Sequence, residues 1–305
     1  MAMQAPVQRR PTSSQAGPGL QSWADGDAKV FKLRCGPDYA RNGFKAAAGP
    51  ALYSCVAAEV VAAPIQVRSC IAEVKDRLLQ EAGAAQASKL PEVIIVNFQL
   101  PFCAGGLFGD HPPDDSGCSV LLFFRRRQGA EESCPAARLL RRFLSEDGHP
   151  KTEGRGVSGC FKAVGFLENV DDLKIPHTMR PAIHHFNGKP VLVERETRRY
   201  FAGEVVELAV DVRGFNALAR GLLKQLKGQL NAASLQLGLL VQGCSEAELP
   251  EGLLGAVQLQ GLDLLRGRRV FCKAARKMEV CTEPTSLSGV QVRWWWLLAI
   301  VILIR

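Results

Sequence analysis

Arginines gather at two neighbouring places in the middle of the chain. Arg125, Arg126 and Arg127 end an apolar run, and three more arginines recur at helical spacing within residues 135–144. Guanidinium groups bind phosphate oxygens in bidentate pairs. Two clusters this close in sequence could therefore converge on a phosphate. The alternative interpretation is a solvated strand end followed by a solvated helix face.

Motifs that would indicate catalysis are sparse. Gly188-Lys189 begins like a phosphate-binding loop, but Pro190 stands where such a loop requires Ser or Thr. No nucleophile with a neighbouring base and no carboxylate pair is apparent from spacing, although catalytic triads are spatial and can be hidden in a sequence. We therefore expect a non-enzymatic protein that needs no cofactor.

Acidic and histidine side chains also fail to form a metal-binding pattern. Asp110, Asp114 and Asp115 surround His111, but a solvated loop explains such a cluster more often than a metal site does. Residues 171–185 are expected to be irregular, with His177, His184 and His185 on loops or at the surface. We expect no metal.

Ten cysteines are scattered along the chain with no CxxC pair and no zinc-type spacing. We expect them to be small buried residues in a reducing compartment. Those beside apolar segments are Cys35, Cys55, Cys118, Cys160 and Cys244.

The elements that must position these residues are clearest from Lys189 to Leu264. Apolar residues alternate in Glu204 to Val212, with Glu207 and Asp211 on the other side, which predicts a strand with one wet face. Such sheets are usually antiparallel. Further strands are expected at 235–241 and 253–259. An amphipathic helix is expected between them and the first strand, over 214–231, and Ser245 with Glu248 predicts a capped short helix before Pro250.

The remaining segments predict a fold of the same kind. Strands are expected near 30–33 and over 51–61, 92–100, 118–124 and 160–167, and amphipathic helices over 68–81 and 135–144. The fold class expected is α+β, with a largely antiparallel sheet packed against several amphipathic helices in a single domain. The hydrophobic content of 47% is enough for a packed core.

Short blocks of residues recur in an order typical of one known family. The longest runs from Val241 to Val257 and is followed by Leu262-Asp263-Leu264; earlier blocks are Phe31 to Tyr39, Gly49 to Tyr53, Val96 to Pro101, Phe161-Lys162, Lys189 to Leu192, Thr197 to Phe201 and Ala219 to Gly221. In these blocks the chain resembles the plant enhanced disease resistance protein 2, C-terminal domain family, over roughly residues 22 to 266. It departs from the family in 171–185, which lacks a tryptophan before the Lys-Pro block.

The resemblance implies a role at membranes, because in plant relatives this domain follows a pleckstrin-homology and a START domain, and a role in restraining defence-linked cell death. No reaction is associated with the family. Arginines in the family-like blocks join the cluster at the end of the apolar run as candidate lipid or phosphate contacts, with a salt bridge to Glu207 or Asp211 as the competing explanation. The complete set is Arg34, Arg125, Arg126, Arg127, Arg198, Arg199 and Arg220.

Both ends of the chain differ in composition from the middle. Residues 1–21 are expected to be a disordered lead-in, 22–266 the family-like domain, and 267–305 a basic linker with an apolar tail. Trp294, Trp295 and Trp296 begin that tail and are a candidate membrane anchor, since indole rings favour the headgroup region. Eleven apolar residues span about 16 Å as a helix, too little to cross a bilayer core of about 30 Å.

The formal charge of +8 suits an anionic partner. We expect a cytoplasmic, lipid- or membrane-associated regulatory module whose partner is an anionic phospholipid or membrane surface; protein partners stay open. One alternative is a hydrolase or transferase that uses Arg198, Arg199, Arg220 and the loop around His111. Nucleic-acid binding is a third hypothesis, which is not favoured because no stacking platform accompanies the basic charge.

Overall fold

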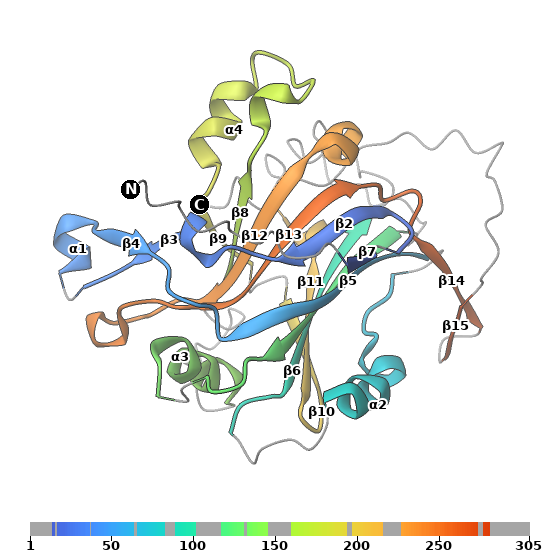
Figure 1. Cartoon of the computed structure of the whole chain (residues 1–305), viewed down its shortest axis with the longest axis horizontal. Helices are drawn as coiled ribbons and strands as arrows, with labels where there is room; N and C mark the ends of the chain where they lie inside the picture. The colour runs from blue at the N-terminus through green and yellow to red at the C-terminus, as the bar shows by residue number, and fades with distance from the viewer. Residues whose placement is uncertain are drawn as a thin grey trace, which may run out of the picture.

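The computed structural model describes the residue ranges 14–15, 17–36, 38–63, 66–82, 89–101, 117–130, 133–145, 160–193, 197–215, 227–273 and 277–280. Within these ranges the chain forms a six-stranded sheet, a seven-stranded sheet and a two-stranded hairpin (Figure 1). The hairpin pairs β3 (Lys32–Arg34) with β4 (Lys45–Ala47).

The six-stranded sheet is antiparallel throughout. Long central strands carry the apolar alternation expected from the sequence, and short strands close both edges. In spatial order the strands are β1 (Ser14–Gln15), β2 (Leu20–Asp25), β13 (Leu253–Leu262), β12 (Ser234–Val241), β8 (Phe161–Leu167) and β9 (Pro190–Leu192).

The seven-stranded sheet is mixed, because β11 runs parallel to β6 and β14 runs parallel to β5. Its central strands are buried on both faces, which is typical of sheets covered on two sides. In spatial order the strands are β10 (Thr197–Ala202), β11 (Val205–Asp211), β6 (Val93–Pro101), β7 (Gly117–Arg126), β5 (Tyr53–Ala63), β14 (Arg268–Lys273) and β15 (Lys277–Val280).

Short helices fill the connections between strands. The α-helices described are α1 (Tyr39–Asn42), α2 (Ile71–Ala82), α3 (Pro135–Leu144) and α4 (Arg180–Phe186). Turns of 3-10 helix are η1 (Ala28–Val30), η3 (Val170–Asp172), η5 (Val212–Gly214), η6 (Lys227–Ala232) and η7 (Glu246–Glu248).

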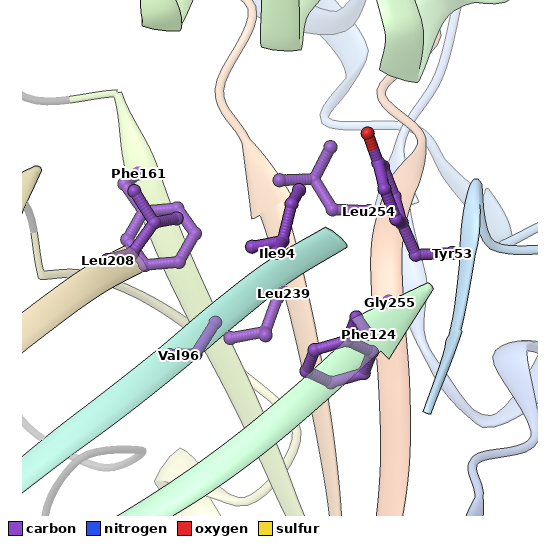
Figure 2. Close-up of a pocket in the computed structure, with 9 residues that line it drawn as sticks. All are labelled: Tyr53, Ile94, Val96, Phe124, Phe161, Leu208, Leu239, Leu254 and Gly255. Atoms are coloured by element: carbon purple, nitrogen blue, oxygen red, sulfur yellow. The ribbon is translucent and has the colours of Figure 1, made fainter. Parts of the chain in front are cut away.

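The main core lies between the two large sheets. It joins side chains such as Val96 and Leu122 of the seven-stranded sheet to Leu239 and Val257 of the six-stranded sheet. Figure 2 shows the interior, where a cavity of about 10 Å³ is lined by Tyr53, Ile94, Val96, Phe124, Phe161, Leu208, Leu239, Leu254 and Gly255. The cavity between the sheets is therefore large enough for about one water molecule.

Gly255 allows the two sheets to approach closely. A Cβ atom at this position would lie 2.5 Å from the ring of Phe124, which is closer than carbon atoms can pack. Any larger residue would push β13 away from β7. The glycine is therefore required by packing rather than by backbone conformation.

The predicted fold class is wrong. The described chain is mostly β, with two large sheets packed face to face and four α-helices beside them, rather than one sheet packed against several helices. The physical reason is that the apolar face of each large sheet is covered mainly by the other large sheet. Alternating apolar residues predict a buried face but do not tell what covers it.

The prediction of a wet second face on the strand containing Glu207 is also wrong. Glu207 is completely buried and accepts hydrogen bonds from the backbone of Cys70 and Ile71 at the start of α2, both at 2.9 Å. Asp211 accepts a hydrogen bond from Gln66 at 3.0 Å. These carboxylates hold the segment that leads into α2 against the sheet.

Several local predictions are confirmed. Helices α2 and α3 lie where periodicity predicts them, and strands β11, β12 and β13 match the three expected in the last third of the domain. The prediction that 171–185 is irregular is only partly confirmed, because 173–179 form no helix or strand but η3 and α4 occupy the two ends. The helix expected over 214–231 falls mostly outside the described residues, and its last part forms η6. The domain boundaries stay predictions.

Candidate functional site

The hairpin of β3 and β4 projects from one end of the molecule, with α1 at its tip (Figure 1). One side of the hairpin is anchored, because Leu33 packs with Leu240 and Leu253 on the outer face of the six-stranded sheet. Arg34 lies directly opposite Lys45 in the register, on the other side. The local sequence thus separates an apolar side, which contains Leu33, from a basic side, which contains Arg34 and Lys45.

Basic side chains dominate the exposed part of this hairpin. Residues 27–47 contain five basic and two acidic residues. Lys32, Arg41 and Lys45 are exposed. Arg41 forms a 2.7 Å ion pair with Asp38, but the guanidinium stays 79% exposed, so this surface pair contributes little to stability.

The same segment also exposes an apolar side chain, since Phe44 is 55% exposed. Gly43 ends α1 in the left-handed conformation, with φ of 63°, which favours glycine. The amide of Phe44 donates a 2.8 Å hydrogen bond to the side-chain oxygen of Asn42. The backbone at the tip is therefore fixed by its own sequence while the aromatic ring stays in solvent.

A buried ion cluster lies where the hairpin meets the domain. Glu251 accepts hydrogen bonds on Oε1 from Arg34, at 2.9 Å from Nε and 2.5 Å from Nη2. The same oxygen lies 3.4 Å from Nζ of Lys162 and 3.2 Å from the amide of Gly243. The hairpin is thus joined by charge to β8 and to the loop between β12 and β13.

The cluster carries two cations for one carboxylate. Burial, together with the neighbouring Arg34, lowers the pKa of Lys162 even though Glu251 opposes the shift. Burial would also lower the pKa of Arg34, but the hydrogen bond and charge of Glu251 outweigh it and raise that pKa. Oε2 of Glu251 is buried and accepts no hydrogen bond from the described residues. The site thus has an excess positive charge and one unsatisfied acceptor.

Helix α3 is bound to the same loop through Arg142. Arg142 donates a 2.8 Å hydrogen bond to the carbonyl of Gln242 and forms an ion pair with Glu248. Glu248 also accepts the amide hydrogen of Ser245 at 3.2 Å, as the capping box predicts. The loop of residues 242–252 is therefore held between α3 and the hairpin.

The arginines predicted to bind phosphate mostly engage partners within the protein. Arg34 pairs with Glu251, Arg126 lies 2.9 Å from Glu92, and Arg127 pairs with Asp25. Each guanidinium would have to divide its donors between that carboxylate and a phosphate.

The remaining predicted arginines are dispersed. Arg125 precedes Arg126 at the end of β7. Arg199 donates to the carbonyl of Phe143 and lies 5.2 Å over its ring, whereas Arg198 is exposed on edge strand β10. Arg220 lies outside the described residues.

Other predicted features have different outcomes. Trp294, Trp295, Trp296 and the Asp/His loop of residues 110–115 lie outside the described residues. His184 and His185 are at the surface as expected, but on α4 rather than on a loop; His184 lies 3.1 Å from Asp171.

The prediction that the cysteines are buried is only partly confirmed. Cys55 and Cys118 are buried, but Cys35 and Cys160 are half-buried and Cys244 is exposed. Cys244 lies in the loop of residues 242–252, after β12 has ended at Val241. Its apolar neighbours in sequence do not cover it there.

Sequence reasoning missed the residues that make this site. Lys162 and Glu251 are 89 positions apart and meet only because β8 and the loop after β12 lie side by side. A charged residue in the apolar strand 160–167 was the available signal, because a buried lysine requires a partner.

None of the helices in the described ranges is long and apolar enough to cross a membrane. Comparison with curated proteins and with solved structures found no match. The family model described as protein ENHANCED DISEASE RESISTANCE 2, C-terminal, matches residues 23–263, which is most of the chain. The blocks that carry the resemblance include Arg34, Lys162 and the loop with Glu251. The chain therefore belongs to the ENHANCED DISEASE RESISTANCE 2 C-terminal family.

Proposed function

We propose that this domain is a non-enzymatic regulatory module that binds the anionic surface of a membrane through the β3–β4 hairpin. The observation that carries the proposal is Phe44, which is 55% exposed in the same hairpin as the exposed Lys32, Arg41 and Lys45. Basic residues near an anionic leaflet contribute about 1 kcal/mol each. An aromatic ring that enters the headgroup region adds apolar burial to this attraction.

The interior of the sandwich supports binding at the surface rather than in a cavity. The cavity between the sheets measures about 10 Å³, whereas pockets for small molecules measure ~300–1,000 Å³. An acyl chain would have to displace core side chains such as Phe124 and Leu239. The exposed hairpin requires no such rearrangement.

The ion cluster gives the hairpin a fixed orientation. Arg34 is held by Glu251 and by the carbonyl of Gly243, at 2.6 Å from Nη2. Because this side chain is held by internal partners, Lys32, Arg41 and Lys45 are the exposed basic groups of the hairpin that can contact headgroups. We further propose peripheral association from the cytoplasm and, from the family resemblance, a part in restraining defence-linked cell death.

Co-sedimentation of the full chain with vesicles tests the membrane role. Binding should require phosphatidylserine in a phosphatidylcholine vesicle and should weaken as salt shortens the range of charge attraction. Lys32→Glu with Lys45→Glu should weaken binding by about 30-fold or more. Lys174→Glu with Arg266→Glu changes the net charge equally at exposed positions elsewhere and should have little effect.

Two further variants locate the contact. Arg198→Glu removes the exposed arginine of β10, and a chain that ends at Arg293 removes the tryptophan-rich tail. Loss of binding with the tail alone would assign the anchor to Trp294–Trp296 and overturn the role of the hairpin. If the full chain binds neither type of vesicle, the membrane role is wrong.

A further inference from the structure

Two cysteine side chains touch each other beside the ion cluster. The Sγ atoms of Cys160 and Cys244 are 3.4 Å apart, although the residues are 84 positions apart in sequence. A disulfide bond is about 2.05 Å long, so the sulfurs need to approach by about 1.4 Å. Rotation of the two side chains and a small shift of the loop supply a movement of this size.

The backbone already holds the two segments together. The amide of Gln242 donates a 2.6 Å hydrogen bond to the carbonyl of Cys160, which extends the ladder between β12 and β8 by one pair. Cys244 follows two residues later, in the loop. The thiols are therefore brought together by strand pairing, not by a chance contact between long side chains.

The environment of Cys244 favours reaction with an oxidant. The side chain is exposed, and Nη2 of Arg142 lies 3.6 Å from its sulfur. A thiolate is the form of cysteine that attacks an oxidant, and an exposed thiol is accessible to both solvent and oxidant. Cys160 is half-buried directly behind it, in the place of a resolving thiol.

Two thiols of the core lie in less reactive surroundings. Burial, reinforced by Asp25, raises the pKa of Cys55, and burial, reinforced by Glu207, raises the pKa of Cys70. Both side chains are enclosed by the core. Oxidation is therefore expected at Cys160 and Cys244 before these two core thiols.

We infer that Cys160 and Cys244 form a modification site at which hydrogen peroxide closes a reversible disulfide. The thiolate of Cys244 attacks one peroxide oxygen, the O–O bond breaks, and the products are a sulfenic acid and, after protonation, water. The thiol of Cys160, after giving up its proton, then attacks this sulfur and displaces the hydroxyl group as a second water. The two sulfurs lose two electrons to the peroxide, and a dithiol reductant returns both thiols.

The bond would fasten the loop that supports the hairpin. Gly243 precedes Cys244 and contacts both Arg34 and Glu251, so a covalent link at Cys244 fixes one side of the ion cluster to β8. The disulfide joins residues that are 84 positions apart, and closing a loop of this length greatly reduces the conformational entropy of the unfolded chain. The thermal midpoint should therefore rise on the order of 10 °C.

Peptide mapping of the full-length protein tests the inference without reference to membrane binding. After peroxide treatment, digestion without reductant should release a peptide pair joined through Cys160 and Cys244, and dithiothreitol should separate it. The higher thermal midpoint should appear and disappear with that pair. Cys160→Ser and Cys244→Ser should each abolish both effects, whereas Cys35→Ser, at a half-buried thiol after β3, should retain both.

The mapping result on the unaltered chain decides the question even if a variant fails to fold. Sulfinic acid at Cys244 with Cys160 still a thiol would overturn the inference. The inference is equally wrong if peroxide joins other cysteines in place of this pair. A cross-linked pair in a protein that does not bind vesicles would leave this site established and the proposed membrane role refuted.

Discussion

Two buried glutamates in this domain have opposite surroundings. Glu207, inside the seven-stranded sheet, accepts from Ser69, Cys70 and Ile71 on one oxygen and from Asn97 on the other, all at 2.7–2.9 Å. Glu251, beneath the hairpin, receives all its hydrogen bonds from the described part of the chain on one oxygen. The first carboxylate is satisfied by neutral donors, and the second is shared by two cations.

The difference separates a structural role from one open to regulation. Glu207 has no accessible surface, and three of its four donors belong to the turn that begins α2. Glu251 is also buried, but its partner Arg34 belongs to an exposed hairpin and its neighbour Gly243 precedes a thiol in solvent. A change at the surface can therefore reach the second cluster, whereas the first is shielded by α2.

Removal of Glu207 should have the largest effect on stability. Glu207→Ala removes the acceptor of the Cys70 amide and the nearer acceptor of both the Ile71 amide and the Asn97 side chain, which should cost about 4 kcal/mol of unfolding free energy. Denaturant titration measures the loss. Glu73→Ala, at an exposed glutamate in the first turn of α2, is the matched control and should cost about 0.5 kcal/mol. Similar losses in both variants would contradict the structural role of Glu207.

Removal of Glu251 should cost somewhat less unfolding free energy, and a second substitution should restore part of it. Glu251→Met leaves Arg34 and Lys162 as buried cations without a counter-ion, with an expected loss of about 3 kcal/mol. Adding Lys162→Met removes one of these charges and should restore part of that stability. The unfolding free energies of both single variants and the double variant form the test. Strictly additive losses would show that the two side chains do not interact.

Lys162 should also make stability depend on pH. Its pKa is lowered from 10.5 in the folded protein, so between the two values the unfolded chain binds more protons than the native one. The unfolding free energy should therefore rise with pH through this window. Lys162→Met should remove that contribution when denaturation curves are compared from about pH 7 to about pH 10. An unchanged pH profile in the variant would contradict the burial of a charged lysine.

A third carboxylate, at the sheet surface, should have the smallest effect. Burial would raise the pKa of Glu168, but hydrogen bonds from Ser234, Gln236 and Gln258 outweigh it and lower the pKa. Solvent screens this site, so Glu168→Gln should cost under about 1 kcal/mol near neutral pH. The difference from the unaltered protein should vanish as pH falls through the native pKa, because both side chains are then neutral. Persistence of the full difference in acid would show that charge is not the cause.

The sequence predicts where the strands lie better than it predicts which elements pack against them. Alternating residues such as Val206, Leu208 and Val210 identify one core face of β11 correctly. The same alternation wrongly predicts that Glu207 faces water. The sequence pattern does not show that backbone amides at the start of α2 cover this carboxylate. Helices α2 and α3 form as expected, but a second sheet covers the face that the prediction assigned to helices.

The candidate site was less predictable than the fold because it depends on contacts over long sequence distances. Arg34 was singled out as a phosphate contact, yet its partner Glu251 is 217 positions away. Phe44 carried a local signal, an aromatic residue before a lysine in a loop, that was not used. The thiols of Cys160 and Cys244 meet only after β8 pairs with β12.

The most direct test of the membrane-binding hairpin compares two exposed phenylalanines. Phe44 is 55% exposed on the basic hairpin, and Phe201 is 58% exposed on edge strand β10. Binding isotherms with phosphatidylserine-containing vesicles should show an affinity about tenfold lower for Phe44→Ser, since the ring no longer enters the headgroup region. Phe201→Ser should bind like the unaltered protein. Equal losses in both variants, or a loss in Phe201→Ser alone, would contradict binding through the hairpin.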